Sequence, residues 1–394
     1  MRFLTGGESH GPALVVIVDG LPAGLMVPVE RIDGELARRQ RGYGRGGRMR
    51  IETDRVQVLS GIRLGRTMGS PVSLLIENRD HGNWSDVMAV EVPEGGPPPG
   101  RVQPRPGHGD LAGMLKTGTS DARDVLERAS ARETAARTAA GAVAKLLLDE
   151  LGITVASRVI RIGGVSSDAG EVSKDAFTGV DEDPVRCADP EASRLMTGEI
   201  DLASEEGDSL GGVFEVAAFG VMPGIGSPSE YDRRLDARLC GALASIPGIK
   251  GVEVGAGFSL AGMRGSSAHD EIFFEAPRGL YRETNRAGGL EAGMTNGEPL
   301  VLRAAMKPIP TLASPLATVD LETLEPARAF KERADVCAVP AAAVVGEAVV
   351  ALELASAVID KFGGDSMGDL TGSLSGYLER IGGLWKRGVF SSSQ

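Results

Sequence analysis

The chain has 394 residues, of which 42% are apolar and 24% are charged, and its formal net charge is -12 at pH 7. This composition is typical of a folded soluble protein with two domains, or with one large domain built from two similar halves. The N-terminal sequence lacks the apolar run of a signal peptide, and Glu347 and Glu353 interrupt the most apolar segment (341–359), so neither a signal peptide nor a membrane span is expected. The three cysteines lie far apart in the sequence, which disfavours a disulfide framework and favours a reducing cytoplasm.

The first half of the chain is predicted to form strands followed by a long helix. Apolar or alternating runs predict strands at 13–18, 55–61 and 72–77, and the spacing of Val29, Ile32 and Leu36 predicts a helix between the first two. Four prolines and three glycines make residues 91–100 a surface loop. Ser130 and Glu133 match a capping box before an Ala- and Leu-rich helix, and Gly152 is its expected C-terminal cap.

The second half repeats this order. Strands are predicted at 213–221 and 299–306, and Ser229 and Asp232 are expected to open a helix that ends at Pro247. A further helix from Pro340 to Gly363 is apolar on nearly every side and should be buried. We therefore expect one large domain, residues 1–394, with approximate halves 1–200 and 201–394 whose long helices pack together between sheets.

Six arginines lie in one short segment, residues 38–50. Their charge is +6 and the formal net charge of the whole chain is -12, so the rest of the chain has a net charge of -18. Such runs are often solvated faces or flexible arms. This one contains no lysine, and the planar guanidinium suits a two-point grip on phosphate or carboxylate. Nucleic acid is disfavoured because aromatic residues are only 4% of the chain and the remaining charge repels a polyanion. We expect a small, multiply charged ligand, and a glycine-rich segment that orders over it.

Two histidines lie in glycine-flanked loops beside carboxylates, His10 near Glu8 and His108 near Asp110. This setting suits proton transfer, although solvated loop histidines have the same surroundings. Residues 42–47 match the dinucleotide-binding glycine pattern, but they follow a predicted helix instead of a strand, which disfavours that interpretation. Histidine pairs at metal-ligand spacing are absent from the sequence, so no metal site is predicted.

Seven segments taken in order resemble the chorismate synthase family. They are GESHG (7–11), RRQRGYGRGGRM (38–49), RPGHGD (105–110), RASARET (128–134), NRAGGLEAGMTNG (285–297), KPIPT (307–311) and RADVCAVP (333–340). Each motif is weak alone, but the ordered set is specific, and the resemblance runs to about residue 370.

The resemblance implies an enzyme, a carbon–oxygen lyase, that removes phosphate from 5-enolpyruvylshikimate 3-phosphate to give chorismate on the route to aromatic amino acids. It implies a tightly bound reduced FMN with no net redox change. It also implies an α+β fold, a β-α-β sandwich with a layer of long helices between antiparallel sheets, assembled as a homotetramer. The implied partner is this small substrate, with neither nucleic acid nor membrane.

The resemblance also assigns roles to individual residues. His10 would stabilise or protonate the departing phosphate, and His108 would lie near the N1 and O2 edge of the flavin. The flavin N5 atom would remove the C6 hydrogen of the substrate, and Asp335 would help to take a proton from N5. Substrate or nucleotide (NADP) phosphate would be bound by Arg39 and Arg45, with Arg48, Arg105 and Arg132 as helpers. The flavin would be bound by Arg128, Ala129, Ser130, Pro247, Gly248, Ala292, Lys307, Pro308, Ile309, Pro310, Thr311 and Arg333.

The chain departs from the family pattern at two of these places. Pro247-Gly248 stands where many members have Asn-Ala or Gln-Ala, and Ala292 replaces a common glycine. Two other classes of protein stay open at this point, namely a polyanion-binding protein that uses residues 38–50 and a flavoenzyme that performs net oxidoreduction.

Overall fold

The computed structural model describes residues 1–46, 53–168, 170, 172–276, 279–330, 332 and 335–387. Its first sheet is antiparallel, with the strand order β1-β2-β6-β3. The strands are β1 (Arg2–Gly6), β2 (Ala13–Asp19), β6 (Val72–Glu77) and β3 (Val56–Ser60). Along β2 and β6 every second side chain is buried, as expected for a sheet with one face on the core.

The second sheet is also antiparallel and has the order β10-β15-β9-β7-β8. Its strands are β10 (Ile249–Val254), β15 (Leu300–Met306), β9 (Gly212–Phe219), β7 (Thr154–Ile162) and β8 (Val165–Ser166). Short hairpins extend from the two sheets: β4 (Ile62–Arg63) with β5 (Arg66–Thr67), β11 (Ile272–Glu275) with β12 (Gly279–Arg282), β13 (Leu290–Glu291) with β14 (Met294–Thr295), and β16 (Ala317–Val319) with β17 (Pro326–Arg328).

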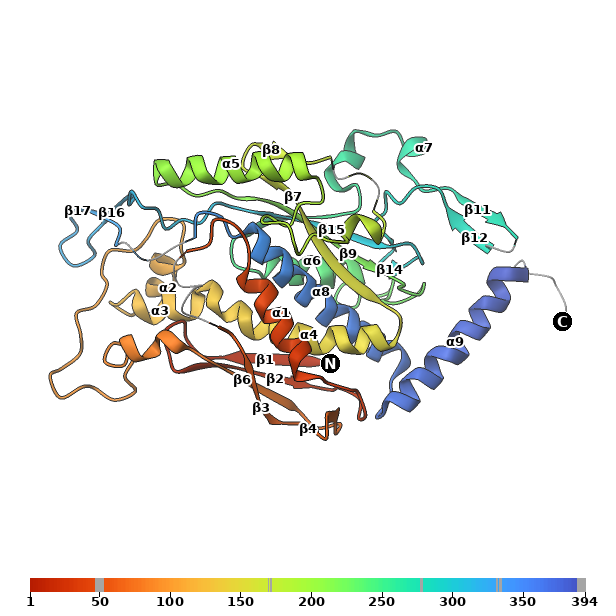
Figure 1. Cartoon of the computed structure of the whole chain (residues 1–394), viewed down its shortest axis with the longest axis horizontal. Helices are drawn as coiled ribbons and strands as arrows, with labels where there is room; N and C mark the ends of the chain where they lie inside the picture. The colour runs from red at the N-terminus through yellow and green to blue at the C-terminus, as the bar shows by residue number, and fades with distance from the viewer. Residues whose placement is uncertain are drawn as a thin grey trace.

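Long helices lie between the two sheets (Figure 1). Helix α4 (Thr134–Glu150) packs on β2 and β6, α8 (Val339–Phe362) packs on β7 and β9, and α4 and α8 pack on each other. They approach closely at Gly141, where an added Cβ would lie 2.5 Å from the Cα atom of Ala348. Helix α8 is long and apolar enough to cross a membrane, but 83% of its most apolar window is buried inside the protein, as in a core helix.

The other helices surround this layer. They are α1 (Val29–Gln40), α2 (Asp110–Thr117), α3 (Arg123–Ala129), α5 (Pro190–Glu206), α6 (Leu235–Ala244), α7 (Gly265–Ala268) and α9 (Met367–Arg387). Figure 1 places α2, α3 and the β16–β17 hairpin at one end of the molecule, and α9 with the β11–β12 hairpin at the other. Helix α1 packs on both α4 and α8.

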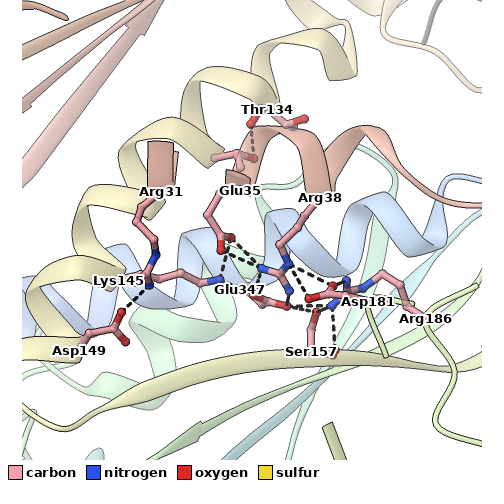
Figure 2. Close-up of polar contacts among 11 residues, drawn as sticks. Arg31, Glu35, Arg38, Thr134, Lys145, Asp149, Ser157, Asp181, Arg186 and Glu347 are labelled. Carbon is pink, nitrogen blue, oxygen red and sulfur yellow. Dashed lines mark hydrogen bonds and ion pairs between the residues drawn. The ribbon is translucent and has the colours of Figure 1, made fainter. Parts of the chain in front are cut away.

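A buried cluster of charges joins the helices of the central layer (Figure 2). Glu347 of α8 is fully buried, and burial alone would raise the pKa of its carboxyl; the cations of Lys145 and Arg38 outweigh that effect and hold the pKa well below its usual range. The carboxylate accepts hydrogen bonds from four side chains, those of Arg38 (2.8 and 2.9 Å), Arg186 (3.1 Å), Ser157 (2.6 Å) and Lys145. Glu35 and Asp181 bind the same cations, so three carboxylates balance three cations.

The predicted mixture of helices and antiparallel sheets is confirmed, and the predicted strands and long helices agree closely with β2, β3, β6, β9, β15, α1, α4 and α8. The capping box is wrong. The Ser130 hydroxyl accepts from the Arg132 amide (3.3 Å), a 3-10 turn (Ala131–Glu133) precedes α4, and Glu133 binds Arg137. Helix α6 begins at Leu235, because residues 229–234 form turns. The division into two related halves stays a prediction.

Candidate active site

Several loops that are distant in sequence converge on the end of the helical layer where α2 and α3 lie (Figure 1). The β1–β2 loop carries His10, the end of α1 carries Arg39 and leads to Arg45, and the α3–α4 junction carries Arg132. Hydrogen bonds connect these loops. The Ser9 amide donates to the Glu127 carbonyl (2.9 Å), and the hydroxyls of Ser9 and Ser130 lie 3.1 Å apart. Residues 7–11 and 128–134, which are far apart in the sequence, are therefore in direct contact.

Two buried arginines share the carboxylate of Asp54. Arg132 donates to both Asp54 oxygens at 2.7 Å, and Arg39 Nη1 lies 3.7 Å from Oδ2. Burial and the neighbouring cations of Arg132 and Arg45 lower the pKa of Arg39 to about 10, so it is still charged at pH 7. Its Nη1 atom is buried and has no hydrogen-bond partner among the described residues. Such a donor is suited to a ligand anion.

Arg45 and Asp335 form an ion pair with 3.2 Å between Nη1 and Oδ2. The other Asp335 oxygen accepts from the Gly46 amide at 2.6 Å, which joins the start of α8 to the segment after α1. That segment is also held at Gly44, whose φ of 82° and close contact with Cys337 favour glycine, and whose carbonyl accepts from the Val336 amide. Asp335 and Arg45 are thus placed together by several independent contacts.

The arginines of residues 38–50 do not all face the site. Arg38 points into the helical layer, where Glu347, Glu35 and Asp181 occupy its guanidinium (Figure 2). Helical spacing explains this, because the successive residues Arg38 and Arg39 lie about 100° apart around α1. Arg41 is exposed. Arg48, Arg50 and the predicted flavin contact Arg333 lie outside the described residues.

His10 is held by a carboxylate and an aromatic ring. Its Nδ1 atom lies 2.9 Å from Glu127 Oε1, and its backbone amide donates to Glu127 Oε2 at 2.8 Å. The imidazole stacks on Trp84 with 4.0 Å between ring centroids. Arg123 donates to Glu127 at 2.8 Å and lies 4.9 Å above the Trp84 ring. This group is almost enclosed, with 12% of the His10 side chain and 3% of the Glu127 side chain exposed.

Arg105 is already fully engaged in the protein. Its guanidinium binds Asp110 in two places (2.7 and 3.0 Å), contacts Glu332 at 3.1 Å and lies over the Phe330 ring. Glu332 also accepts from Arg123 at 3.1 Å, so it connects the Arg105 and His10 groups. The assignment of Arg105 as a substrate contact stays a prediction.

His108 faces the segment that follows β15. Its Nε2 atom lies 3.0 Å from the Thr311 hydroxyl, while Nδ1 is buried without a hydrogen-bond partner in the described part of the chain. Burial and the nearby Arg105 lower the pKa of His108 to about 4, so the ring is neutral at pH 7. Gly107 has a φ of 78°, and a Cβ there would approach Pro310 to 2.7 Å. His108 and residues 307–311 therefore form one wall of the site.

The other predicted flavin contacts lie in three places. Pro247 and Gly248 adjoin the His108 wall, since the Lys307 amide donates to the Gly248 carbonyl at 2.9 Å. Ser130 lies beside Ser9, and Arg128 donates to the carbonyls of Thr5 and Gly7. Ala129, between them, ends α3. Ala292 is in the β13–β14 turn, and Figure 1 shows β14 well away from α2 and α3, so the assignment of Ala292 stays a prediction.

Sequence analysis did not identify four of the side chains that build this site, namely Asp54, Trp84, Arg123 and Glu127. Arg123 and Glu127 have the i,i+4 spacing of a helical ion pair just before the RAS motif, which is a usable signal. The contact of Glu127 with His10 spans 117 residues and could not be read from spacing.

Buried arginines, a carboxylate-bound histidine and an Asp–Arg pair are typical of enzymes that act on small, multiply charged anions. The comparisons identify the family. A family model for chorismate synthase matches residues 1–359. Chorismate synthase of Desulforudis audaxviator is 59% identical over 386 residues, covering 97% of this chain and 98% of that protein, and that of Symbiobacterium thermophilum is 57% identical over 388 residues, covering 97% and 99%. A crystal structure of chorismate synthase aligns with a TM-score of 0.77 at 40% identity and covers 97% of this chain and 98% of that one. The chain belongs to the chorismate synthase family.

Proposed function

We propose that this chain converts 5-enolpyruvylshikimate 3-phosphate and reduced FMN to chorismate, phosphate and unchanged reduced FMN. The observation that carries the proposal is the buried pair Arg39 and Arg132 beside Arg45, in a segment that contacts the His10 loop through Ser130 and Ser9, in a chain of this family. The substrate carries two carboxylates and a phosphate, and the cluster supplies cations where charge develops as phosphate leaves.

The residues of the site fit a flavin. The buried His108 Nδ1 and Arg39 Nη1 atoms are two hydrogen-bonding positions without a protein partner in the described ranges. The flavin would be held by the 307–311 segment, the adjoining Pro247-Gly248 turn and residues 128–130, with neutral His108 at its polar edge. Reduced FMN, when bound, lends electron density that assists the departure of phosphate.

The roles of the protein side chains follow from the reaction. In this 1,4-elimination the C3–O bond breaks with both electrons leaving on phosphate, and a hydrogen is lost from C6. Arg39 and Arg45 bind the anionic groups, and His10 gives a proton to the departing phosphate. Asp335, whose Oδ1 accepts a hydrogen bond from the Gly46 amide, receives the proton that balances the loss at C6.

We also propose that the chain forms the homotetramer of the family. The outward face of the first sheet supports this proposal, because Leu4 (72% exposed) pairs in register with Ile17 (43%), and Val15 lies beside them. Such a continuous apolar face is typical of a surface that another subunit covers. The central helical layer between two sheets is consistent with the family's β-α-β sandwich. Free thiols at all three cysteines support a cytoplasmic location.

An anaerobic assay of the purified protein tests the function. With reduced FMN we expect phosphate and chorismate in a one-to-one ratio, and with flavin omitted we expect neither. Adding NADPH with oxidised FMN determines whether the chain reduces its own flavin. Steady consumption of the nicotinamide in step with product would favour the net oxidoreductase, and salt-dependent binding to an oligonucleotide without turnover would favour the polyanion-binding protein.

A further inference from the structure

We propose that Glu127, held in place by Arg123, is a positioning residue that keeps a hydrogen on Nδ1 of His10, so that Nε2 is the nitrogen that gives up its proton. The inference deepens the proposed function, in which His10 protonates the departing phosphate. It assigns a task to a buried carboxylate that the family motifs do not include.

The charge of Glu127 determines which atom donates the hydrogen bond between His10 Nδ1 and Glu127 Oε1. Although burial opposes ionisation, hydrogen bonds from His10 and Arg123 hold the pKa of Glu127 below its usual range, so the group is a carboxylate at neutral pH. An ionised carboxylate can only accept hydrogen bonds. The contact of 2.9 Å between Oε1 and Nδ1 therefore requires a hydrogen on Nδ1.

Three contacts fix the orientation of the ring. The Glu127 carboxylate binds both the Nδ1 atom and the backbone amide of His10, which joins the ring to its own main chain. Trp84 covers one face of the imidazole at 4.0 Å, and Arg123 lies against Trp84. On the main-chain side, the ring of His81 forms a 2.9 Å hydrogen bond with the carbonyl of His10.

Arg123 keeps the carboxylate from rotating away. It donates to Glu127 Oε1 at 2.8 Å, and its other nitrogen donates to Glu332 at 3.1 Å. Arg123 is itself buried, so its charge needs both carboxylates. The carboxylate has little freedom to turn from His10.

The proton balance is simple. An imidazolium at His10 gives the Nε2 hydrogen to a phosphate oxygen and becomes the neutral ring with its hydrogen on Nδ1, which Glu127 already binds. No side-chain rotation is needed to stabilise the product form. In water the neutral imidazole ring favours the Nε2–H tautomer. The protein must therefore stabilise the Nδ1–H tautomer, and it does so through the hydrogen bond with Glu127.

Nuclear magnetic resonance of protein labelled with 15N-histidine tests the inference without turnover. The chain has four histidines, and His10→Gln assigns the signals of His10. In the wild-type protein, at a pH where the ring is neutral, we expect the Nδ1–H tautomer. In Glu127→Gln, Arg123 binds the amide oxygen in the place of Oε1, which is also the atom that Nδ1 contacts, and the NH2 group then faces the backbone amide of His10, which loses its acceptor. The remaining acceptor for an Nδ1 hydrogen is neutral and weaker than the carboxylate, so we expect a clearly larger share of the Nε2–H tautomer there.

Kinetics complete the test. Glu127→Gln should lower kcat by about 100-fold with KM changed less than about threefold, since general acid–base catalysis contributes 10²–10⁴-fold and ligand contacts are unchanged. Glu127→Asp, which keeps the charge, should recover part of kcat. The matched control is Glu215→Gln, which removes another fully buried carboxylate, bound by Arg158 and Arg303 on the second sheet. It should lower the melting temperature but change neither kcat nor the tautomer.

The outcomes separate the two proposals. A wild-type His10 ring in the Nε2–H form would overturn the inference, and this measurement needs no variant to fold. So would a Glu127→Gln protein with an unchanged tautomer or with wild-type kcat. Absence of chorismate formation by the wild-type enzyme would instead count against the proposed function, while the tautomer spectrum would still decide the role of Glu127.

Discussion

Adjacent arginines in this protein have opposite tasks. Arg38 neutralises Glu347 in the interior of the helical layer, and Arg39 lies beside Arg132 and Asp54 at the site. The sequence displays both as one run of positive charge, and only the orientation of α1 separates them. A charge count alone therefore overestimates the number of arginines available to a ligand.

Arg45 and Asp335 form an ion pair, but we expect Arg45 to bind an anionic group and Asp335 to accept a proton, so their substitutions should have different kinetic effects. Arg45→Ala removes a charged hydrogen bond, so kcat/KM should fall about 10- to 100-fold, and Arg45→Lys should restore only part of it. Asp335→Asn should lower kcat by about 100-fold, because an amide accepts no proton at neutral pH. Both effects are measured by steady-state kinetics.

The double variant distinguishes a chemical role of Asp335 from a purely supporting one. If Asp335 receives a proton, Asp335→Asn should lower kcat further in the Arg45→Ala background. No further loss there would show that Asp335 acts only by holding Arg45. Asp201→Ala, which removes the acceptor of the Tyr43 hydroxyl in the same segment, is the control and should leave kcat unchanged.

His108 predicts a pH dependence of stability. Its folded-state pKa of about 4 is below the ordinary value of 6.5, so between these pH values the unfolded chain binds a proton that the folded protein does not. Stability should fall as pH decreases through this window. In His108→Gln, the free energy of unfolding should fall by about 1 kcal/mol less than in the wild type over this pH range. This is less than the full pKa difference would give, because the ring is only partly buried.

Urea unfolding at pH 7 and pH 4.5 measures this difference, with His269→Gln as the control histidine substitution. An identical pH dependence in wild type and His108→Gln would refute the buried, neutral assignment of His108. The control should keep the wild-type slope, because His269 is in a different part of the fold, after α7.

At the scale of the elements, the contact between α4 and α8 depends on the absence of a side chain at Gly141. A Cβ there would lie 2.4 Å from Ala348 Cβ and 2.5 Å from its Cα, and backbone cannot move aside cheaply. Gly141→Ala should therefore cost about 1–3 kcal/mol. Gly198→Ala in α5 meets nothing within 4 Å and should gain about 0.5–1 kcal/mol from helix propensity. Denaturant midpoints measure both, and equal destabilisation by the two changes would contradict the close-packing argument.

The elements also show what sequence reasoning could determine. The bounds of α8 were predicted to within a residue, because Pro340 begins it and Gly363 ends it. The start of α4 was misplaced because Ser130 and Arg132 have partners elsewhere: Ser130 meets Ser9, and Arg132 reaches Asp54. Local capping rules do not include such long-range contacts.

In the site, too, local sequence signals could be read but long-range contacts could not. The motif residues His10, His108 and Asp335 could be selected from the sequence, since their glycine-rich or helix-start surroundings are local. Their partners could not. Asp54 lies 78 residues from Arg132, and Glu127 lies 117 residues from His10, so only the fold brings them into contact.

For the whole molecule, the exposed apolar face of the first sheet gives a prediction about assembly. Ile17→Lys places a charge on that face without touching the protein's own core, since Ile17 points outward from β2. It should weaken the oligomer at least about tenfold, because an unpaired charge in an interface is costly. Analytical ultracentrifugation measures the dissociation. Val90→Lys, a fully exposed loop position, is the control, and unchanged assembly in Ile17→Lys would show that this face is not an interface.

The charge cluster around Glu347 has a consequence for the order in which the chain folds. Arg38 is synthesised 309 residues before its buried partner, Lys145 202 residues before and Arg186 161 residues before. Burying these cations without Glu347 would cost several kcal/mol for each ion. We therefore expect the central layer to close only when α8 is available, because Glu35 and Asp181 alone supply two carboxylates for three cations. We expect the docking of α8 to be the step that completes the burial of this cluster.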